Sequence, residues 1–143
     1  MLKLWVALQR YGTTGLGALY EHLCATTRAL LDAIRERNDF EALHEPESNI
    51  LCFRYVGGGN FTAVQLDALN LDMRTQYNKS GAGWVTTTVL GQRRTLRVTV
   101  MNPRTDARHI RAVLDGLAKV GRLFEQRLTS DARQSAADSY LPR

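Results

Sequence analysis

The sequence predicts an α+β fold in which helices cover one face of a small, mainly antiparallel sheet. Three observations predict this class. Strand-like runs occur at 50–56, 84–89 and 95–100, and stretches of helical periodicity precede, separate and follow them. The resulting order is helix, helix, strand, strand, helix, strand, strand, helix. The 143 residues are 44% apolar and 23% charged, which suits one globular domain with a single core.

Two helices are predicted within residues 2–37. Leu4, Trp5 and Leu8 have helical spacing, and Gly12 offers a stop that is followed by a threonine cap. The second helix carries an inward stripe formed by Leu19, Leu23, Thr27, Leu30 and Ile34. Leu4 and Trp5 are residues of a buried type near the start of this helix, and we expect them to form an exposed apolar patch.

The first two strands are predicted at 40–43 and 50–56. The second is the clearest strand of the chain, since it is an apolar run rich in strand-forming residues. The glycine-rich segment 57–60 follows it, at a place where backbone amides can hold a phosphate. It lacks both the GxGxxG spacing and a Gly-Lys-Ser/Thr ending, so it is interpreted as a plain loop.

The second half of the chain predicts a helix, a hairpin and a last helix. Thr62 and Gln65 match a capping box that opens a helix ending near residue 77, and 84–89 with 95–100 form an antiparallel hairpin around a loop at 90–94. The last helix has its apolar stripe at Ile110, Val113, Leu117, Val120, Phe124 and Leu128.

These elements define one predicted domain. It spans residues 1–128, with the first helices in 2–37 and the sheet and remaining helices in 40–128. Residues 129–143 are polar and small, and are predicted to form a flexible tail.

Charge and hydropathy exclude several classes of partner. The net charge of +5 comes mostly from arginine, but the arginines are scattered among acidic residues, so no nucleic-acid partner is predicted. No apolar run approaches the ~20 residues of a membrane span, so no membrane partner is predicted. The segment Met1–Trp5 lacks the basic-then-apolar layout of a secretory signal, which favours a cytoplasmic protein.

Cysteine and histidine residues indicate no metal site and no nucleophile. Cys24 and Cys52 lack CxxC spacing and are interpreted as reduced core residues. The histidines His22, His44 and His109 lie far apart and have no metal-ligand spacing, so solvated or capping roles are expected for them.

Arg97 is the candidate binding residue. Alternation in the strand 95–100 puts Leu96, Val98 and Val100 on the core face, and Arg97 on the opposite face between two threonines. A guanidinium beside hydroxyls suits a carboxylate ligand, although composition alone favours a plain solvent-exposed arginine. Arg54, on the strand 50–56, is expected to be ion-paired or to extend its stem along apolar surface.

Four segments, in this order along the chain, resemble the end of the group II pyridoxal-phosphate decarboxylases, the family of aromatic amino acid, glutamate and diaminobutyrate decarboxylases. They are Leu2–Trp5 with Gln9–Gly12, Asn49–Arg54, Leu66–Asn70 and Leu96–Thr105. The resemblance covers residues 2 to about 127. It implies the fold of the C-terminal small domain of fold-type I pyridoxal-phosphate enzymes.

The resemblance also implies that the cofactor is bound by a different domain from this one. In the family, the cofactor is held by a histidine-lysine pair and other residues of a large domain, whereas the lysines here, Lys3, Lys79 and Lys119, do not follow a histidine. The expected partners are therefore that large domain, a second copy in a homodimer, and an amino-acid substrate in the complete enzyme. No pyridoxal phosphate is expected on this chain alone, which is expected to be inactive. Arg97 matches a family arginine implicated in binding the substrate carboxylate.

A stand-alone α+β binding or regulatory module is the alternative function. The strands lack the aromatic motifs of an RNA-recognition domain, but the fold class alone allows other ligands. The sequence leaves open which amino acid the complete enzyme would use, and whether the chain is a separate subunit or a fragment.

Overall fold

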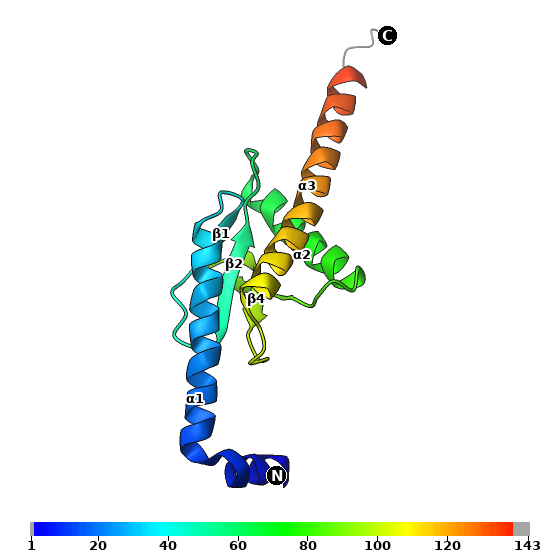
Figure 1. Ribbon diagram of the computed structural model, residues 1–143. Helices are drawn as coiled ribbons and strands as arrows, with labels where there is room; N and C mark the ends of the chain where they lie inside the picture. The colour runs from blue at the N-terminus through cyan, green and yellow to red at the C-terminus, as the bar shows by residue number, and fades with distance from the viewer. Residues whose placement is uncertain (1, 139–143) are drawn as a thin grey trace.

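The computed structural model describes residues 2–138 and shows an α+β arrangement (Figure 1). Its elements follow in the order α1 (Leu2–Arg35), β1 (Phe40–Ala42), β2 (Ile50–Tyr55), α2 (Ala63–Lys79), β3 (Thr86–Leu90), β4 (Arg93–Thr99) and α3 (Ala107–Asp138). The predicted fold class is therefore confirmed. In the described residues, no helix is long and apolar enough to cross a membrane.

The sheet has four antiparallel strands in the order β1-β2-β4-β3. The register pairs Leu51 with Val98 and Phe53 with Leu96, so these side chains share one face, while Cys52 and its partner Arg97 lie on the other. All three helices contribute core residues on the first face: α1 packs against β1 and β2, α2 packs against β4, and α3 packs against α1 and α2 (Figure 1). Helices thus cover one face of the sheet, as the sequence predicts.

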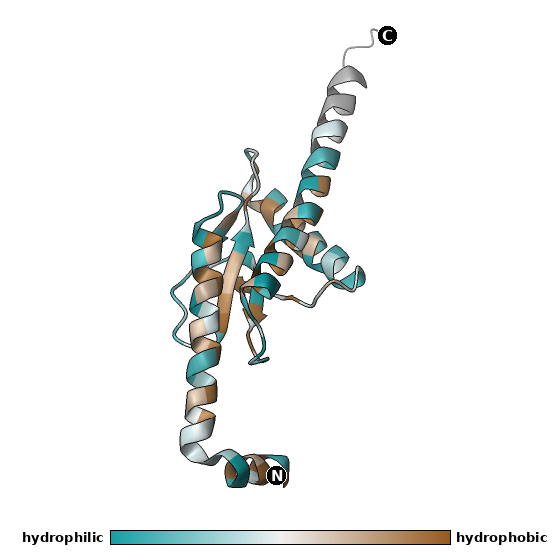
Figure 2. Ribbon diagram, viewed as in Figure 1, coloured by the Kyte–Doolittle hydropathy of each residue, from teal (hydrophilic) through white to brown (hydrophobic). Residues whose placement is uncertain are grey.

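The core lies between the helices and the covered face of the sheet. Figure 2 shows apolar residues along β2 and along α1, where the helix passes the sheet. Phe40 packs edge-on against Phe53 and Tyr55, with ring centroids 5.8 and 5.2 Å apart. The core residues contributed by the helices are Leu30, Leu31, Ile34, Leu69, Met73, Tyr77, Ile110, Leu114, Leu117 and Ala118.

Helix α1 is bent where the sequence predicts a break. Gly12 has φ 63° and ψ −179°, a conformation essentially confined to glycine, and the helix resumes directly after it. The two predicted helices therefore meet at an angle, without an intervening loop (Figure 1).

The hairpin and the last helix differ in extent from the prediction. The turn between β3 and β4 consists of Gly91 and Gln92, both at positive φ, which is shorter than the predicted loop at 90–94. Two positive φ values are typical of the tight turn whose twist matches a hairpin.

Helix α3 continues to Asp138 past the predicted end at residue 128, because 129–138 contains no glycine or proline to stop it. The rest of the predicted tail, 139–143, lies outside the described residues.

Candidate functional site

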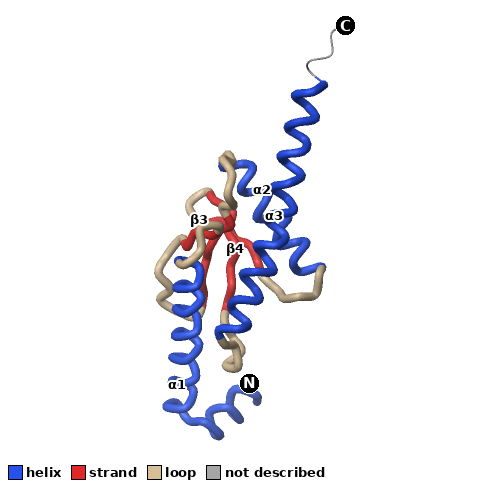
Figure 3. Tube along the Cα trace, turned by 45° about the horizontal axis from the view of Figure 1, so that its top comes forward, coloured by secondary structure: helices blue, strands red, loops and turns tan. Residues whose placement is uncertain are grey.

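The candidate site is the exposed part, around Arg97 and Thr99, of the sheet face opposite the main core. Figure 3 shows the strands in red, with α1, α2 and α3 around them. Alternation along β4 places Thr95, Arg97 and Thr99 on this open face, as the sequence predicts. Thr95 is fully buried, whereas Arg97 and Thr99 are exposed.

Neighbouring strands position the Arg97 backbone. Arg97 is paired with Cys52 of β2 on one side and with Thr86 of β3 on the other. The Thr86 hydroxyl donates a hydrogen bond to the Arg97 carbonyl oxygen at 3.0 Å. Arg97 is therefore held in the middle of the open face while its side chain reaches solvent.

Two arginines of this face differ in how their charge is balanced. Arg54 is buried, and its Nη2 donates to Asp67 at 2.8 Å and to the Ala63 carbonyl at 3.3 Å. The ion-paired reading of Arg54 is thus correct. Among the side chains that the structure describes, by contrast, no carboxylate lies within ion-pair distance of Arg97. Arg97 is consequently the cation of the two that is available for an external anion.

Cys52 stays a neutral thiol beside Arg97. Burial raises the pKa of the Cys52 thiol, and the opposing effects of a Thr95 hydrogen bond and of the Arg97 charge are smaller. The structure pairs neither Cys24 nor Cys52 with another cysteine; Cys52 is buried, as predicted for a core residue, whereas Cys24 is only half-buried. Cys52 is therefore a packing residue of the site, without the thiolate character that nucleophilic chemistry needs.

His44 provides a hydrogen-bond acceptor for the backbone of β2, a role that no motif in the sequence indicates. Its Nε2 accepts a hydrogen bond from the Cys52 backbone N–H at 3.0 Å, and its Nδ1 lies 2.9 Å from the Glu45 carbonyl oxygen. These two contacts require a neutral ring with the proton on Nδ1. His44 thus replaces a missing strand partner of β2, and no spacing rule identifies such a residue.

The structure does not bring the other histidines together. His22 contacts the Pro103 carbonyl at 2.9 Å, and His109 lies 2.8 Å from Asp106 at the start of α3. In the part of the chain whose side chains are described, no group of three histidine, cysteine, aspartate or glutamate residues is arranged to hold a metal ion. Lys3, Lys79 and Lys119 lie on three different helices.

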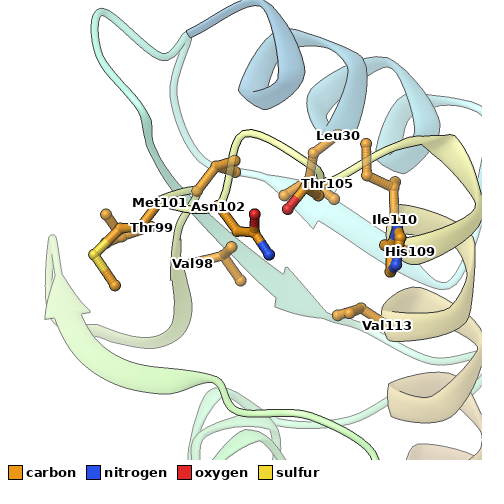
Figure 4. A pocket seen from close by; sticks show the side chains of 10 residues that line it. Leu30, Val98, Thr99, Met101, Asn102, Thr105, His109, Ile110 and Val113 are labelled. Carbon is orange, nitrogen blue, oxygen red and sulfur yellow. The ribbon is translucent and has the colours of Figure 1, made fainter. Parts of the chain in front are cut away.

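A separate apolar pocket of about 310 Å³ lies at the end of β4 (Figure 4). Leu30 of α1, Val98 of β4 and Val113 of α3 form part of its lining, with Asn102 and His109 as polar members. Arg97 is not a lining residue, but Thr99, two residues further along β4, is one. The pocket therefore adjoins the candidate site at Thr99 and does not include Arg97.

Comparisons with known proteins agree with the resemblance in the sequence. L-2,4-diaminobutyrate decarboxylase of Rhizobium meliloti (strain 1021) is 29% identical over 126 residues, which are 87% of this chain and 25% of that protein. Tryptophan decarboxylase 1 of Oryza sativa subsp. japonica is 30% identical over 124 residues, 82% of this chain and 24% of that protein. This chain is similar to one small part of group II pyridoxal-phosphate decarboxylases.

A solved decarboxylase structure shows the same fold. Oryza sativa TDC, determined with PLP and tryptamine, superimposes with a TM-score of 0.74 at 27% identity, over 85% of this chain and 26% of that one. The chain thus spans about a quarter of the length of the decarboxylases it matches. No protein-family model matches the sequence.

Proposed function

We propose that residues 1–128 are a small domain of a pyridoxal-phosphate-dependent amino-acid decarboxylase, and that Arg97 binds the substrate carboxylate when a larger, cofactor-binding part is present. The observation that carries the proposal is the exposed, unneutralised guanidinium of Arg97 on the uncovered face of a sheet shared with decarboxylases. A guanidinium binds a carboxylate through two parallel hydrogen bonds, which fix the carboxylate's orientation as well as its position.

The residues of this chain do not fit the cofactor itself. Pyridoxal phosphate needs a lysine in a shielded site and a cup of donors for its phosphate. The three lysines lie on separate helices, and the glycine-rich loop carries a carboxylate beside it, because a Cβ built on Gly57 would meet Glu125 Oε1. That oxygen would repel a phosphate. We therefore assign the cofactor to the larger part of such a decarboxylase, outside residues 1–128.

A direct test uses the chain alone. After mixing with pyridoxal phosphate and desalting, we expect no stoichiometric visible absorbance to remain with the protein. We also expect no carbon dioxide release from glutamate, tryptophan or 2,4-diaminobutyrate. Stoichiometric cofactor that stays on the chain, together with turnover, would refute the proposal that the cofactor binds outside this chain.

The role of Arg97 is tested by complementation. The chain is co-expressed with the R. meliloti decarboxylase from which the matched region has been deleted, and kcat/KM is measured for 2,4-diaminobutyrate. In a complemented enzyme, Arg97→Ala should lower kcat/KM by ~30-fold to ~1000-fold, as expected for a lost charge-assisted contact of about 2–4 kcal/mol.

Arg111→Ala, which removes an exposed arginine of α3, is the matched control and should change kcat/KM less than twofold. An Arg97→Ala effect smaller than threefold would make Arg97 a bystander.

A further inference from the structure

Strand β3 forms one edge of the sheet, because in the described part of the chain it pairs only with β4 (Figure 3). Its sequence, Thr-Thr-Thr-Val-Leu, contains no charged residue and no proline, and four of its five residues are β-branched. The strand at the opposite edge, β1, has three residues, and the central one is Glu41. Short strands and charged side chains are usual devices that stop an edge from pairing with another strand. Strand β3 therefore lacks a protection that β1 has.

The two-residue turn between β3 and β4 determines which backbone groups of β3 face away from the sheet. The turn is closed by the hydrogen-bonded pair of Leu90 and Arg93, and hydrogen-bonded and non-hydrogen-bonded pairs then alternate along the hairpin. Thr87 and Val89 consequently direct their N–H and C=O groups away from β4. Among the described residues, no hydrogen bond from another element reaches these four groups. We call this outward-facing side of β3 the free edge.

A side chain of α2 limits the free edge at one end. Asn78 accepts a hydrogen bond from the Val85 backbone N–H at 3.0 Å and donates one to the Val85 carbonyl at 2.9 Å. Val85 lies two residues before Thr87, so its backbone groups also face outward. Asn78 thus imitates a strand partner at Val85. The backbone groups left for an added strand are those of Thr87 and Val89, and Val89 is 57% exposed.

Arginines beside the free edge favour an acidic partner. Residues of an added strand opposite Thr87 and Val89 would point to the core side of the sheet, where Arg94, the β4 partner of Val89, also projects. Arg74 precedes Asn78 by one turn of α2, and its Nε is buried without a hydrogen-bond partner among the described residues. Among the described side chains, no carboxylate lies within ion-pair distance of Arg74 or Arg94.

We propose that the free edge of β3 binds an extended, acidic segment of a partner protein by strand addition. Two alternate residues of the segment exchange main-chain hydrogen bonds with Thr87 and Val89. Their carboxylates lie on the side of the sheet that carries Arg94. A second copy of this chain is disfavoured as the occupant, because it would bring another net charge of +5 to the same edge. The inference does not rest on the proposed function, since it uses neither Arg97 nor a cofactor.

The test measures binding of the intact chain to a fluorescein-labelled peptide, Ser-Thr-Glu-Val-Glu-Thr-Ser-amide, by fluorescence anisotropy. We expect saturable binding that weakens with added salt, and at least tenfold weaker binding of the peptide with lysine in place of both glutamates. Arg94→Ala should raise the dissociation constant at least threefold. Arg111→Ala, which removes an exposed arginine of α3, is the matched control and should change it less than twofold. No binding of the acidic peptide up to about 500 μM chain would overturn the proposal.

Two changes test the main-chain hydrogen bonds. Val89→Pro removes an N–H that faces away from β4, so the hairpin keeps its ladder and the dissociation constant should rise at least tenfold. Val89→Thr keeps this N–H and should change the constant less than twofold. Circular dichroism verifies the fold of each variant. Methylation of both glutamate nitrogens of the peptide should abolish binding to the unchanged chain, whereas methylation of the central valine nitrogen should not.

Amide hydrogen exchange locates the contact. The peptide should slow exchange at Thr87 and Val89 and leave Thr88, which already faces β4, unchanged. Equal affinity of the Val89→Pro variant or of the doubly methylated peptide would contradict strand addition. A chain that dimerises without peptide, and loses the dimer in Val89→Pro, would also overturn the proposal and would assign the free edge to a second copy.

Discussion

At the scale of single residues, buried polar side chains complete the hydrogen bonding of the central strand. Asn70, fully buried on α2, accepts from the Tyr55 backbone N–H at 2.9 Å and donates to the Tyr55 carbonyl at 2.9 Å and to the Leu66 carbonyl at 2.8 Å. It thereby replaces a strand partner at the end of β2, where helix α2 crosses the sheet. His44 does the same for Cys52.

Replacement of Asn70 tests this role. Asn70→Ala leaves the buried N–H and C=O of Tyr55 without their partner, and each unsatisfied group costs ~1–3 kcal/mol. We expect the free energy of unfolding, measured with urea, to fall by about 3 kcal/mol or more. Gln76→Ala, at an exposed position of the same helix, should change it by less than about 0.5 kcal/mol. A comparable loss in both variants would show that Asn70 has no special role.

At the scale of elements, one glycine sets the direction of the N-terminal arm, which is residues 2–11 of α1. A Cβ at Gly12 would meet nothing within 4 Å, so an added methyl group is disfavoured by the backbone conformation alone. At such φ/ψ values, a residue other than glycine destabilises the conformation by about 1–3 kcal/mol. Since few contacts hold the arm, a substitution there should relax the bend and leave the core intact.

We therefore expect Gly12→Ala to straighten α1. Nitroxides on Gln9→Cys and Arg28→Cys, in a background with Cys24 and Cys52 replaced by alanine, should move apart toward the ~28 Å rise of a straight helix between these positions. Pulsed electron paramagnetic resonance measures this distance. Gly17→Ala, at another exposed glycine with nothing within 4 Å, should leave the distance unchanged. Equal distances in the parent and in Gly12→Ala would contradict the role of the glycine.

At the scale of the whole molecule, Arg37 connects the segment after α1 to α3. Its guanidinium donates to both carboxylate oxygens of Asp39, at 2.8 and 2.9 Å, and to Asp115 of α3 at 2.7 Å. It also lies over the Phe40 ring, 5.3 Å from the centroid. These hydrogen bonds hold the pKa of the Asp39 carboxyl below its ordinary value.

The lowered Asp39 pKa predicts an acid-dependent stability. The unfolded chain binds a proton at Asp39 more readily than the folded chain, so the contribution is present above the ordinary aspartate value of about 4 and is lost as the pH falls below it. We expect Asp39→Asn to cost about 1 kcal/mol at pH 7 and much less at pH 3, measured by urea unfolding at both values.

Asp32→Asn, at an exposed carboxylate of α1 without an ion pair in the described part of the chain, is the control and should show no such difference. If Asp39→Asn lowers the free energy of unfolding by the same amount at pH 7 and pH 3, the Arg37–Asp39 ion pair does not make the stability depend on pH.

Much of the candidate site is encoded locally. Alternation in β4 places Arg97 on one face and Leu96 on the other, and Thr62 and Gln65 form the predicted capping box, because these features depend only on neighbours along the chain. The strand runs and the break at Gly12 are local for the same reason. The two-residue turn was not predicted, because Gln92 has a positive φ and glutamine is not a residue type that favours this conformation.

The sequence by itself thus determined the fold class, the order of the elements and the face on which Arg97 lies, since each follows from periodicity and local backbone preference. Only the tertiary structure decided which polar groups are neutralised. It pairs Arg54 with Asp67, leaves Arg97 without a carboxylate partner among the described side chains, and inserts Asn70 and His44 as partners of β2. These contacts join residues on different elements, whose approach depends on how the helices pack on the sheet, and no local pattern in a single sequence carries that information.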